Sequence, residues 1–549
     1  MRTILKGLIL FFSMVGIFVM VLLDSRDSLS TTGHTLYFTI GDQTVTAWEK
    51  EDTYYLFLPS YAKLSDVSMA NYSNRFTITA TGETINHKDT LEKLPLNEAI
   101  FCSFDYDDSL FTLCIMKSEN LASVFITTDS GSLDKILADK EYRENGKITV
   151  KKENGETDYN SGLSYIKGRG NYSWNSYEKK PFTISIKNEQ SLLGLPAGTD
   201  YVLVSNASDP TLIRNDLVRG MEENLNILYT GKGRFVDLFI NGEYQGNYYL
   251  CDKIEVGESR IPIANLEEQM DRIYSKTDYE SYTDYETPDK KAKNLDVVPH
   301  DITGGYLLER EFKDRYELEY GENKSCFITD SEEHFIVTSP MYCSKEQIEY
   351  ISGYFNEAEA AIFAEDGVNA ITGESYTEYI DMESFAKKYL VEEVSKNYDA
   401  GISSSFFYKD SDSINKKIFA GPGWDYDMTF GNYLEWMEDF SSVPEGISKL
   451  SFHAHASSWY DTLYEKDEFY QIVRGYYARD VSPYLEEILT KDLAEYEQFL
   501  KASANMDYIR WQNQYHNNSY YESRQESFEI LRDFIEKRKN FLDSAWISK

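Results

Sequence analysis

The chain has 549 residues, of which 42% are hydrophobic and 15% aromatic, and its formal net charge is −37. The length predicts two or three domains, and the apolar content excludes a wholly disordered chain. The acidic balance argues against non-specific binding to nucleic acid, whose phosphates it would repel, and against simple electrostatic docking on anionic lipid. Solubility is the simplest reason for the charge.

Residues 1–23 begin with Arg2 and Lys6 and continue as an uncharged, mostly apolar run. The run is close to the length of about 17–25 residues with which a helix spans a bilayer. No small-x-small cleavage pattern follows, and positive charge precedes the run. We therefore expect an uncleaved membrane anchor with a cytoplasmic N-terminus and an exported remainder. The alternative is a cleaved signal peptide and a secreted protein. Residues 24–34 are a short polar linker.

Residues 35–118 alternate between apolar and polar positions in short runs broken by Gly, Asn and Asp. This pattern predicts a small all-β, sandwich-like domain, and it contains no catalytic cluster. The five cysteines of the chain have no CxxC spacing, so no zinc site is suggested. We expect this domain to be a spacer or a binding module.

Residues 119–440 mix strand and helix patterns, and residues 441–549 are mainly helical. A helix is expected to start at Asp209, because apolar residues recur behind it at helical spacing. The pair Asn241-Gly242 predicts a type I′ turn between two alternating strands. Residues 271–300 are polar and without period, which predicts a mobile insertion.

Two aspartates, Asp425 and Asp427, stand two apart in GPGWDYDMTFGN, residues 421–432. On an extended chain such residues share a face, and two carboxylates so placed repel each other unless a hard cation bridges them. Mg²⁺ prefers oxygen ligands and completes its shell with phosphate oxygens and waters. Asn397 and Asp399 end a predicted helix, and Asp399 can orient or deprotonate a hydroxyl or supply a further ligand. The alternative is a pair of solvated turn aspartates.

Basic residues are scarce in the chain but gather in residues 167–187, KGRGNYSWNSYEKKPFTISIK. Lys180, or its neighbour Lys179, can project from a strand toward a phosphate, with glycines that permit a close approach. Asn206 lies before a predicted helix N-terminus, where unpaired N–H groups favour anions, and Arg214 falls in the first turns. The alternatives are a solvated basic turn and ordinary helix capping. No GxSxG, HExxH or Walker-type motif occurs, so hydrolase chemistry has no support.

Six blocks in one order, within about residues 120–440, resemble the CotH family of spore-coat-protein-H-like atypical kinases. They are RGNYSW with KKPFTISIK, LLGLPAGTDYVLVSNASDPTLIRND, FVDLFINGEYQGNYYLCDKIEV, GGYLLERE, VSKNYDA and GPGWDYDMTFGN. The resemblance implies an α+β fold with a divergent protein-kinase-like domain. It further implies binding of ATP with Mg²⁺ or Mn²⁺, and transfer of phosphate to Ser or Thr of a protein.

Carried onto this chain, the resemblance makes Asp399 the catalytic aspartate and Asp425 the metal-binding aspartate, with Asp427 close by and Asn397 as a further ligand. Lys180, or Lys179 beside it, would approach the nucleotide phosphates. Four more residues are assigned to the cofactor site on the same basis: Arg169, Asn206, Arg214 and Glu309.

Two positions depart from the family pattern. The Val or Ile that often precedes Trp-Asp is Gly423 here, which we expect to loosen a strand, and the Ser-Thr after Arg-Gly-Asn is Tyr172-Ser173.

We therefore expect an ATP- and metal-dependent protein kinase at the cell or spore surface, anchored by its N-terminal helix. Its acidic surface suits a basic, serine-containing substrate. The rival hypotheses are an adhesin- or coat-like binding protein and a pseudokinase that binds nucleotide without transfer.

Overall fold

The computed structural model describes residues 35–274, 279–321, 324–432, 443–451, 458–515 and 523–548. The expected membrane segment, residues 1–23, lies outside these ranges. Within them, no helix is both long and apolar enough to cross a membrane. The described residues divide into two compact units, one formed by residues up to 58 with 62–116, and the other by 59–61 with the residues from 117 onward.

The smaller unit consists of strands, as its alternating sequence predicts. Their bounds are β1 (Tyr37–Ile40), β2 (Gln43–Thr46), β3 (Trp48–Lys50), β4 (Thr53–Leu58), β5 (Val67–Met69), β6 (Phe76–Ile78), β7 (Thr84–Ile85), β8 (Ala99–Phe104) and β9 (Leu110–Lys117). They form two sheets, with orders β2-β1-β5 and β3-β4-β9-β8-β6-β7. Along β8, Ile100, Cys102 and Phe104 are buried while the residues between them are more exposed, which is the two-residue period of a half-buried strand.

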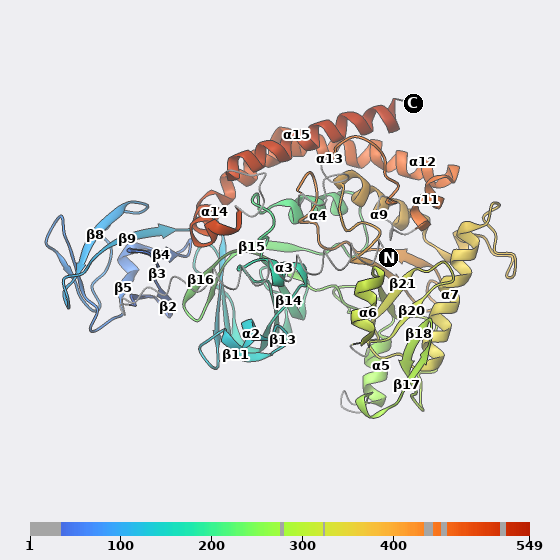
Figure 1. Ribbon diagram of the computed structural model, residues 1–549, viewed down its shortest axis with the longest axis horizontal. Helices are drawn as coiled ribbons and strands as arrows, with labels where there is room; N and C mark the ends of the chain where they lie inside the picture. Colours follow the sequence, from blue (N-terminus) through green and yellow to red (C-terminus); the bar gives the residue numbers. More distant parts are fainter. Residues whose placement is uncertain are drawn as a thin grey trace, which may run out of the picture. The chain divides into compact units, whose positions relative to one another are not determined.

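The larger unit begins with a closed barrel (Figure 1). Its strands are β10 (Ala122–Thr128), β11 (Glu144–Lys151), β12 (Thr157–Gly168), β13 (Phe182–Gln190), β14 (Gly198–Val204), β15 (Gly233–Ile240) and β16 (Glu243–Asp252). The strand order is β10-β11-β12-β13-β14-β16-β15, and β10 pairs with β15 in parallel to close the barrel. The barrel core contains Val124, Ile148 and Ile184, all fully buried.

The hairpin β15–β16 forms as its turn residues predict. Ile240 pairs with Glu243, so the loop has two residues, and Asn241 and Gly242 have φ of 51° and 84°. Two consecutive positive φ angles are the mark of a type I′ turn, so that prediction is confirmed.

A second sheet follows the barrel, with the order β17-β18-β20-β21-β19-β22-β23. Its strands are β17 (Asp284–Thr287), β18 (Lys290–Lys293), β19 (Tyr306–Arg310), β20 (Cys326–Ile328), β21 (His334–Ser339), β22 (Ser405–Lys409) and β23 (Ile418–Ala420). The segment 271–300 thus holds a hairpin joined to β20, not an insertion without secondary structure. These strands could not be predicted from hydrophobic alternation because their side chains are mostly polar. Their pairing rests on backbone hydrogen bonds to a neighbouring strand, which need no such alternation. Residues 275–278 of this segment lie outside the described ranges.

Helices complete the larger unit. They are α2 (Asp134–Ala138), α3 (Tyr172–Ser176), α4 (Arg214–Asn224), α5 (Leu266–Ile273), α6 (Lys313–Gly321), α7 (Lys345–Phe363), α8 (Tyr376–Tyr379), α9 (Met382–Ser395), α11 (Ser458–Tyr464), α12 (Asp467–Tyr476), α13 (Ser482–Glu487), α14 (Leu493–Tyr515) and α15 (Arg524–Leu542). The C-terminal part is helical, as expected. The architecture is therefore mixed α+β with an all-β region at its start.

Helix α4 begins five residues later than the sequence predicts. Leu212 has φ of 68°, which no right-handed helix accommodates, and the Asp209 carboxylate accepts hydrogen bonds from the backbone of Thr211 and of Arg214. Asp209 therefore closes a turn before the helix and holds its first residue.

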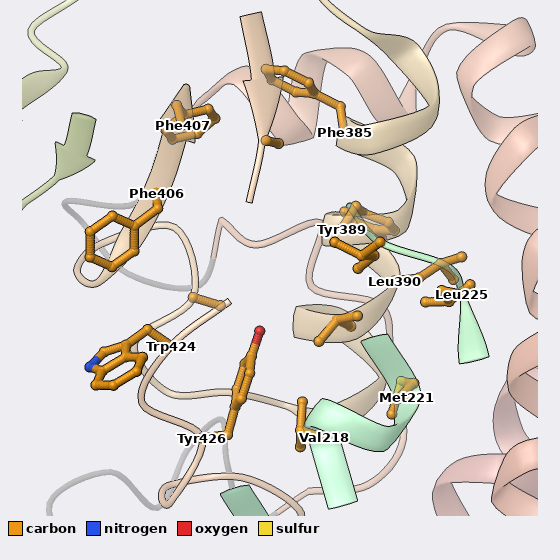
Figure 2. Packing of buried hydrophobic residues seen from close by; sticks show 14 of the residues in the cluster. Val218, Met221, Leu225, Phe385, Tyr389, Leu390, Phe406, Phe407, Trp424 and Tyr426 are labelled. Carbon is orange, nitrogen blue, oxygen red and sulfur yellow. The ribbon is translucent and has the colours of Figure 1, made fainter. Parts of the chain in front are cut away.

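The core that holds the acidic segment lies between α4 and α9. Figure 2 shows Trp424 and Tyr426 among the buried residues of this cluster, which includes Val218 and Met221 of α4 and Leu390 of α9. Tyr426 is completely buried. Its side chain thus anchors the segment between the two aspartates in the core.

Candidate active site

The two adjacent aspartates lie in a loop, not on a strand. Strand β23 ends at Ala420, and Asp425 has φ of 58°, so the extended chain expected here is not formed. Both carboxylates are partly exposed, and each accepts a hydrogen bond: Asp425 from the Ser404 hydroxyl at 3.0 Å and Asp427 from the Ser208 hydroxyl. They are held near each other by the loop geometry and not by the strand alternation on which the prediction rested.

The loop that carries Asp399 joins this acidic loop through the backbone. The amide of Tyr398 donates to the carbonyl of Met428 at 3.3 Å, and the amide of Phe430 donates to the carbonyl of Ser395 at 2.7 Å. The end of α9 and the acidic loop are therefore paired. The structure brings Asp399 to the two aspartates, although some 26 residues of sequence separate them.

The carboxylates of Asp399 and Asp427 feel the charge of their acidic neighbours. Burial raises the pKa of Asp399 to about 7, with further contributions from Asp425 and Asp427. Burial also raises the pKa of Asp427 to about 6, followed by the effect of Asp425. Like charges that converge in a partly buried site favour either a bound proton or a bound cation.

The donor set fits a hard divalent cation. In the described ranges no group of three or more His, Cys, Asp and Glu side chains is arranged to hold a metal ion. Two partly exposed carboxylates remain, and Mg²⁺ commonly binds to one or two carboxylates while phosphate oxygens and waters complete its shell. The side chain of Asn397, the further ligand expected from the sequence, is less available to a metal because it already has two hydrogen-bond partners. Its amide donates to Glu392 at 2.8 Å, and its carbonyl oxygen accepts from the Asp399 amide at 3.2 Å.

The basic loop that follows β12 lies next to the aspartates. The Arg169 guanidinium is 5.0 Å from the centroid of the Trp424 ring. Burial raises the pKa of Tyr172 and of Tyr177, and the Asp427 carboxylate adds to both shifts. This loop, residues 169–177, thus brings a cation and two phenols to the acidic site.

The two predicted phosphate-binding lysines have other partners. The Lys179 ammonium is buried, 2.5 Å from Asp507 of α14, and it donates to the Asn247 carbonyl at 2.6 Å. The half-buried Lys180 donates to the carbonyl of Trp174, in the middle of α3, at 2.5 Å. Lys179 fastens α14 to the barrel, and Lys180 fastens the basic loop.

Asn206 and Arg214 support the acidic loop from behind. Asn206 accepts from the Asn215 amide at 3.0 Å, and Asn215 in turn accepts from the Tyr426 backbone amide at 3.0 Å. The fully buried Arg214 donates to the Thr429 carbonyl at 2.9 Å and pairs with the Asp209 carboxylate. Both side chains are close to the site but face the protein.

Glu309 lies in β19, next to the loop of Asp399. It shares a hydrogen bond with Glu311, whose pKa is raised to about 9 by burial and then by Glu309. Glu311 also accepts from the Ser403 hydroxyl at 3.1 Å. The pair thus braces the loop between α9 and β22.

Sequence reasoning missed a set of buried charges behind the acidic loop: Glu222, Lys388 and Glu392. A signal existed, because Lys388 and Glu392 stand four residues apart in α9, the spacing at which oppositely charged side chains meet on one helix face. Gly423 is also explained by this set. A Cβ at position 423 would lie 1.6 Å from the Tyr426 hydroxyl oxygen, so the glycine permits a close contact and does not loosen a strand.

No curated protein is similar enough in sequence to match this chain. The model of one protein family, described as CotH kinase protein, matches residues 166–542. This range covers most of the barrel, the second sheet, the acidic loops and the C-terminal helices. The chain therefore belongs to the CotH kinase protein family.

Proposed function

We propose that this protein is an ATP-dependent protein kinase that requires Mg²⁺ or Mn²⁺ and transfers phosphate to Ser or Thr of a protein substrate. The observation that carries the proposal is the convergence of Asp399, Asp425 and Asp427, with the basic loop 169–177 beside them. Phosphoryl transfer depends mainly on positioning and on charge stabilisation, and these are what such a site supplies.

Each residue has a role that follows from its place. Asp425 and Asp427 would hold the divalent cation, which neutralises charge on the phosphates when it is bound. Asp399 would receive and orient the acceptor hydroxyl, and a pKa of about 7 suits a group that takes a proton near neutral pH. Arg169, which lies on the Trp424 ring, is the cation best placed to approach the phosphates.

The charge of the chain and its N-terminal sequence support a proposal for the substrate and the location. A net charge of −37 favours a basic substrate segment over an acidic one. The apolar run in residues 1–23 would anchor the chain with the site outside the cytoplasm. Protease treatment of intact cells would test this placement, since a cytoplasmic site would be protected.

Transfer of radiolabelled phosphate from ATP tests the function directly. The purified full-length chain is incubated with Mg²⁺ or Mn²⁺ and a basic serine-containing peptide, beside Asp399→Asn and Asp425→Asn. The matched control is Asp108→Asn, an exposed aspartate of the smaller unit. We expect transfer by the wild type and by the control, and a loss of at least about 100-fold in the two site variants. Equal transfer by all four proteins would refute the assignment.

One observation favours a second function, surface binding by the smaller unit. Phe101, Tyr106 and Leu110 are 67%, 81% and 73% exposed, in and between β8 and β9. Exposed apolar groups of this kind mark contact sites more often than catalytic ones. A binding protein should tolerate Asp425→Asn and lose its partner when Phe101 is replaced by Ser, while a kinase should respond in the opposite way.

A further inference from the structure

A continuous set of buried polar side chains connects the two acidic loops. At one end, the Tyr426 hydroxyl donates to Glu222 of α4 at 2.7 Å and accepts from the Lys388 ammonium at 3.2 Å. Tyr426 stands between Asp425 and Asp427 in the chain. The hydrogen bonds of its hydroxyl therefore fix the position of both aspartates relative to α4 and α9.

The other end of the set reaches Asp399. Lys388 forms an ion pair with Glu392, one turn further along α9. Glu392 accepts from the Asn397 amide at 2.8 Å, and Asn397 accepts from the Asp399 backbone amide at 3.2 Å. We call the set formed by Glu222, Tyr426, Lys388, Glu392 and Asn397 the Tyr426–Asn397 bridge.

The bridge is buried and closely packed. Its five residues are between 0% and 3% exposed. A buried group that loses its partner costs about 1–3 kcal/mol, so each member holds its neighbour in place. The absence of a side chain at Gly423 allows this packing, because a Cβ there would lie 2.0 Å from a Glu222 carboxylate oxygen.

We propose that the Tyr426–Asn397 bridge is a positioning device that fixes the loop of Asp399 relative to the loop of Asp425 and Asp427. The inference rests on the proposed function, because it assigns to these two loops the acceptor side and the metal side of one reaction. Its members are buried inside the protein, so they act through the aspartates. An error of about 1 Å in such an arrangement can cost 100-fold in rate, which gives a buried linkage between the loops its value.

A buried ionic network that only stabilises the fold would look similar. The two roles differ in what happens at a distance. A positioning bridge transmits the loss of the Tyr426 hydroxyl to the Asp399 amide, at the other end of the set. A merely stabilising network loosens the neighbourhood of Tyr426 and leaves the Asp399 loop as it was.

Amide hydrogen exchange of the full-length protein distinguishes the two roles without any turnover. In Tyr426→Phe, exchange should become about tenfold faster in residues 396–404 as well as in 421–432, since one hydrogen bond of ordinary strength is lost along the path. The matched control is Tyr477→Phe, which removes a buried hydroxyl bonded to Asp543 at 2.8 Å among the C-terminal helices. It should leave both segments unchanged. Faster exchange confined to 421–432 in Tyr426→Phe would overturn the inference.

Two further variants guard against a general loss of folding. Lys388→Arg keeps the cation between Tyr426 and Glu392 and should retain slow exchange in residues 396–404. Glu392→Gln should speed exchange there by a similar factor, and its combination with Tyr426→Phe should add little, because both break one path. Full additivity of the two changes would overturn the inference.

Steady-state kinetics is a third test of the Tyr426–Asn397 bridge. Tyr426→Phe should lower kcat by about 10- to 100-fold while the KM for ATP changes less than about threefold. An unchanged kcat in an active protein would overturn the bridge. If the wild type transfers no phosphate, the proposed function fails, and the exchange data still decide whether the two loops are coupled.

Discussion

The strongest test of how this structure uses its charges is the Lys179–Asp507 pair. Lys179 precedes β13, Asp507 lies in the middle of α14, and their side chains are 1% and 0% exposed. The ammonium also donates to the Asn247 carbonyl, and the Asn247 amide donates to Asp507 at 2.8 Å. The pair therefore joins a helix to the barrel in a buried interface.

Lys179→Met removes one partner and leaves Asp507 buried without its counter-charge. Breaking a buried pair in this way costs about 3–5 kcal/mol, and we expect this decrease in the free energy of unfolding of the larger unit. Replacing both partners, as Lys179→Met with Asp507→Leu, should restore most of the loss, because neither member of the pair is then left buried without its counter-charge. Lys180→Met, at a half-buried position, should cost less.

Guanidinium denaturation at pH 7, followed by far-ultraviolet circular dichroism, measures these differences. ATP binding by the same variants is the complementary assay. If Lys179→Met abolished ATP binding and changed the free energy of unfolding by less than about 1 kcal/mol, Lys179 would face the nucleotide, and the reasoning from burial would be refuted.

Three other outcomes are expected. Burial raises the pKa of Asp237 to about 6, above its unfolded value of about 3.9. The unfolded chain therefore loses this proton first, and the free energy of unfolding should fall by at most about 3 kcal/mol as the pH rises from about 4 to 6. Urea denaturation across this range should show a flatter dependence on pH for Asp237→Asn. Gly423→Ala should lower stability by roughly 1–3 kcal/mol through overpacking, visible in thermal unfolding. Mn²⁺ at about 100 times its Kd should stabilise the wild type by about 2.7 kcal/mol and leave Asp425→Asn unchanged in the same assay.

Local sequence signals predicted the local structure well. The Asn241-Gly242 turn fixes the pairing of β15 with β16 through its own backbone conformation. The hairpin could therefore be predicted without knowledge of any residue far away in the sequence. Helix α7 also begins at a local signal, since Ser344 and Gln347 form a capping box at its start. The closure of the barrel was not predictable in this way, because β10 and β15 pair across more than a hundred residues of chain.

In the candidate site, too, the features that depend on neighbouring residues could be predicted, and those that depend on distant residues could not. The resemblance named Asp399, Asp425 and Asp427, and the structure brings their loops together. Lys179 could not be told from a phosphate ligand in the sequence, because its partner Asp507 lies over 300 residues away. The sequence pattern around a lysine before a strand is the same whether its side chain faces solvent, a ligand or a buried carboxylate.

The close approach at Gly423 also constrains how this protein can change over evolutionary time. A residue with a Cβ at position 423 collides with the Tyr426 hydroxyl, so a larger residue at 423 is strained unless Tyr426 loses its hydroxyl first. Relatives that carry Val or Ile at this point should therefore lack the phenol, and should join the corresponding two loops by other means. Covariation between these two positions, three residues apart, would be the historical trace of the contact.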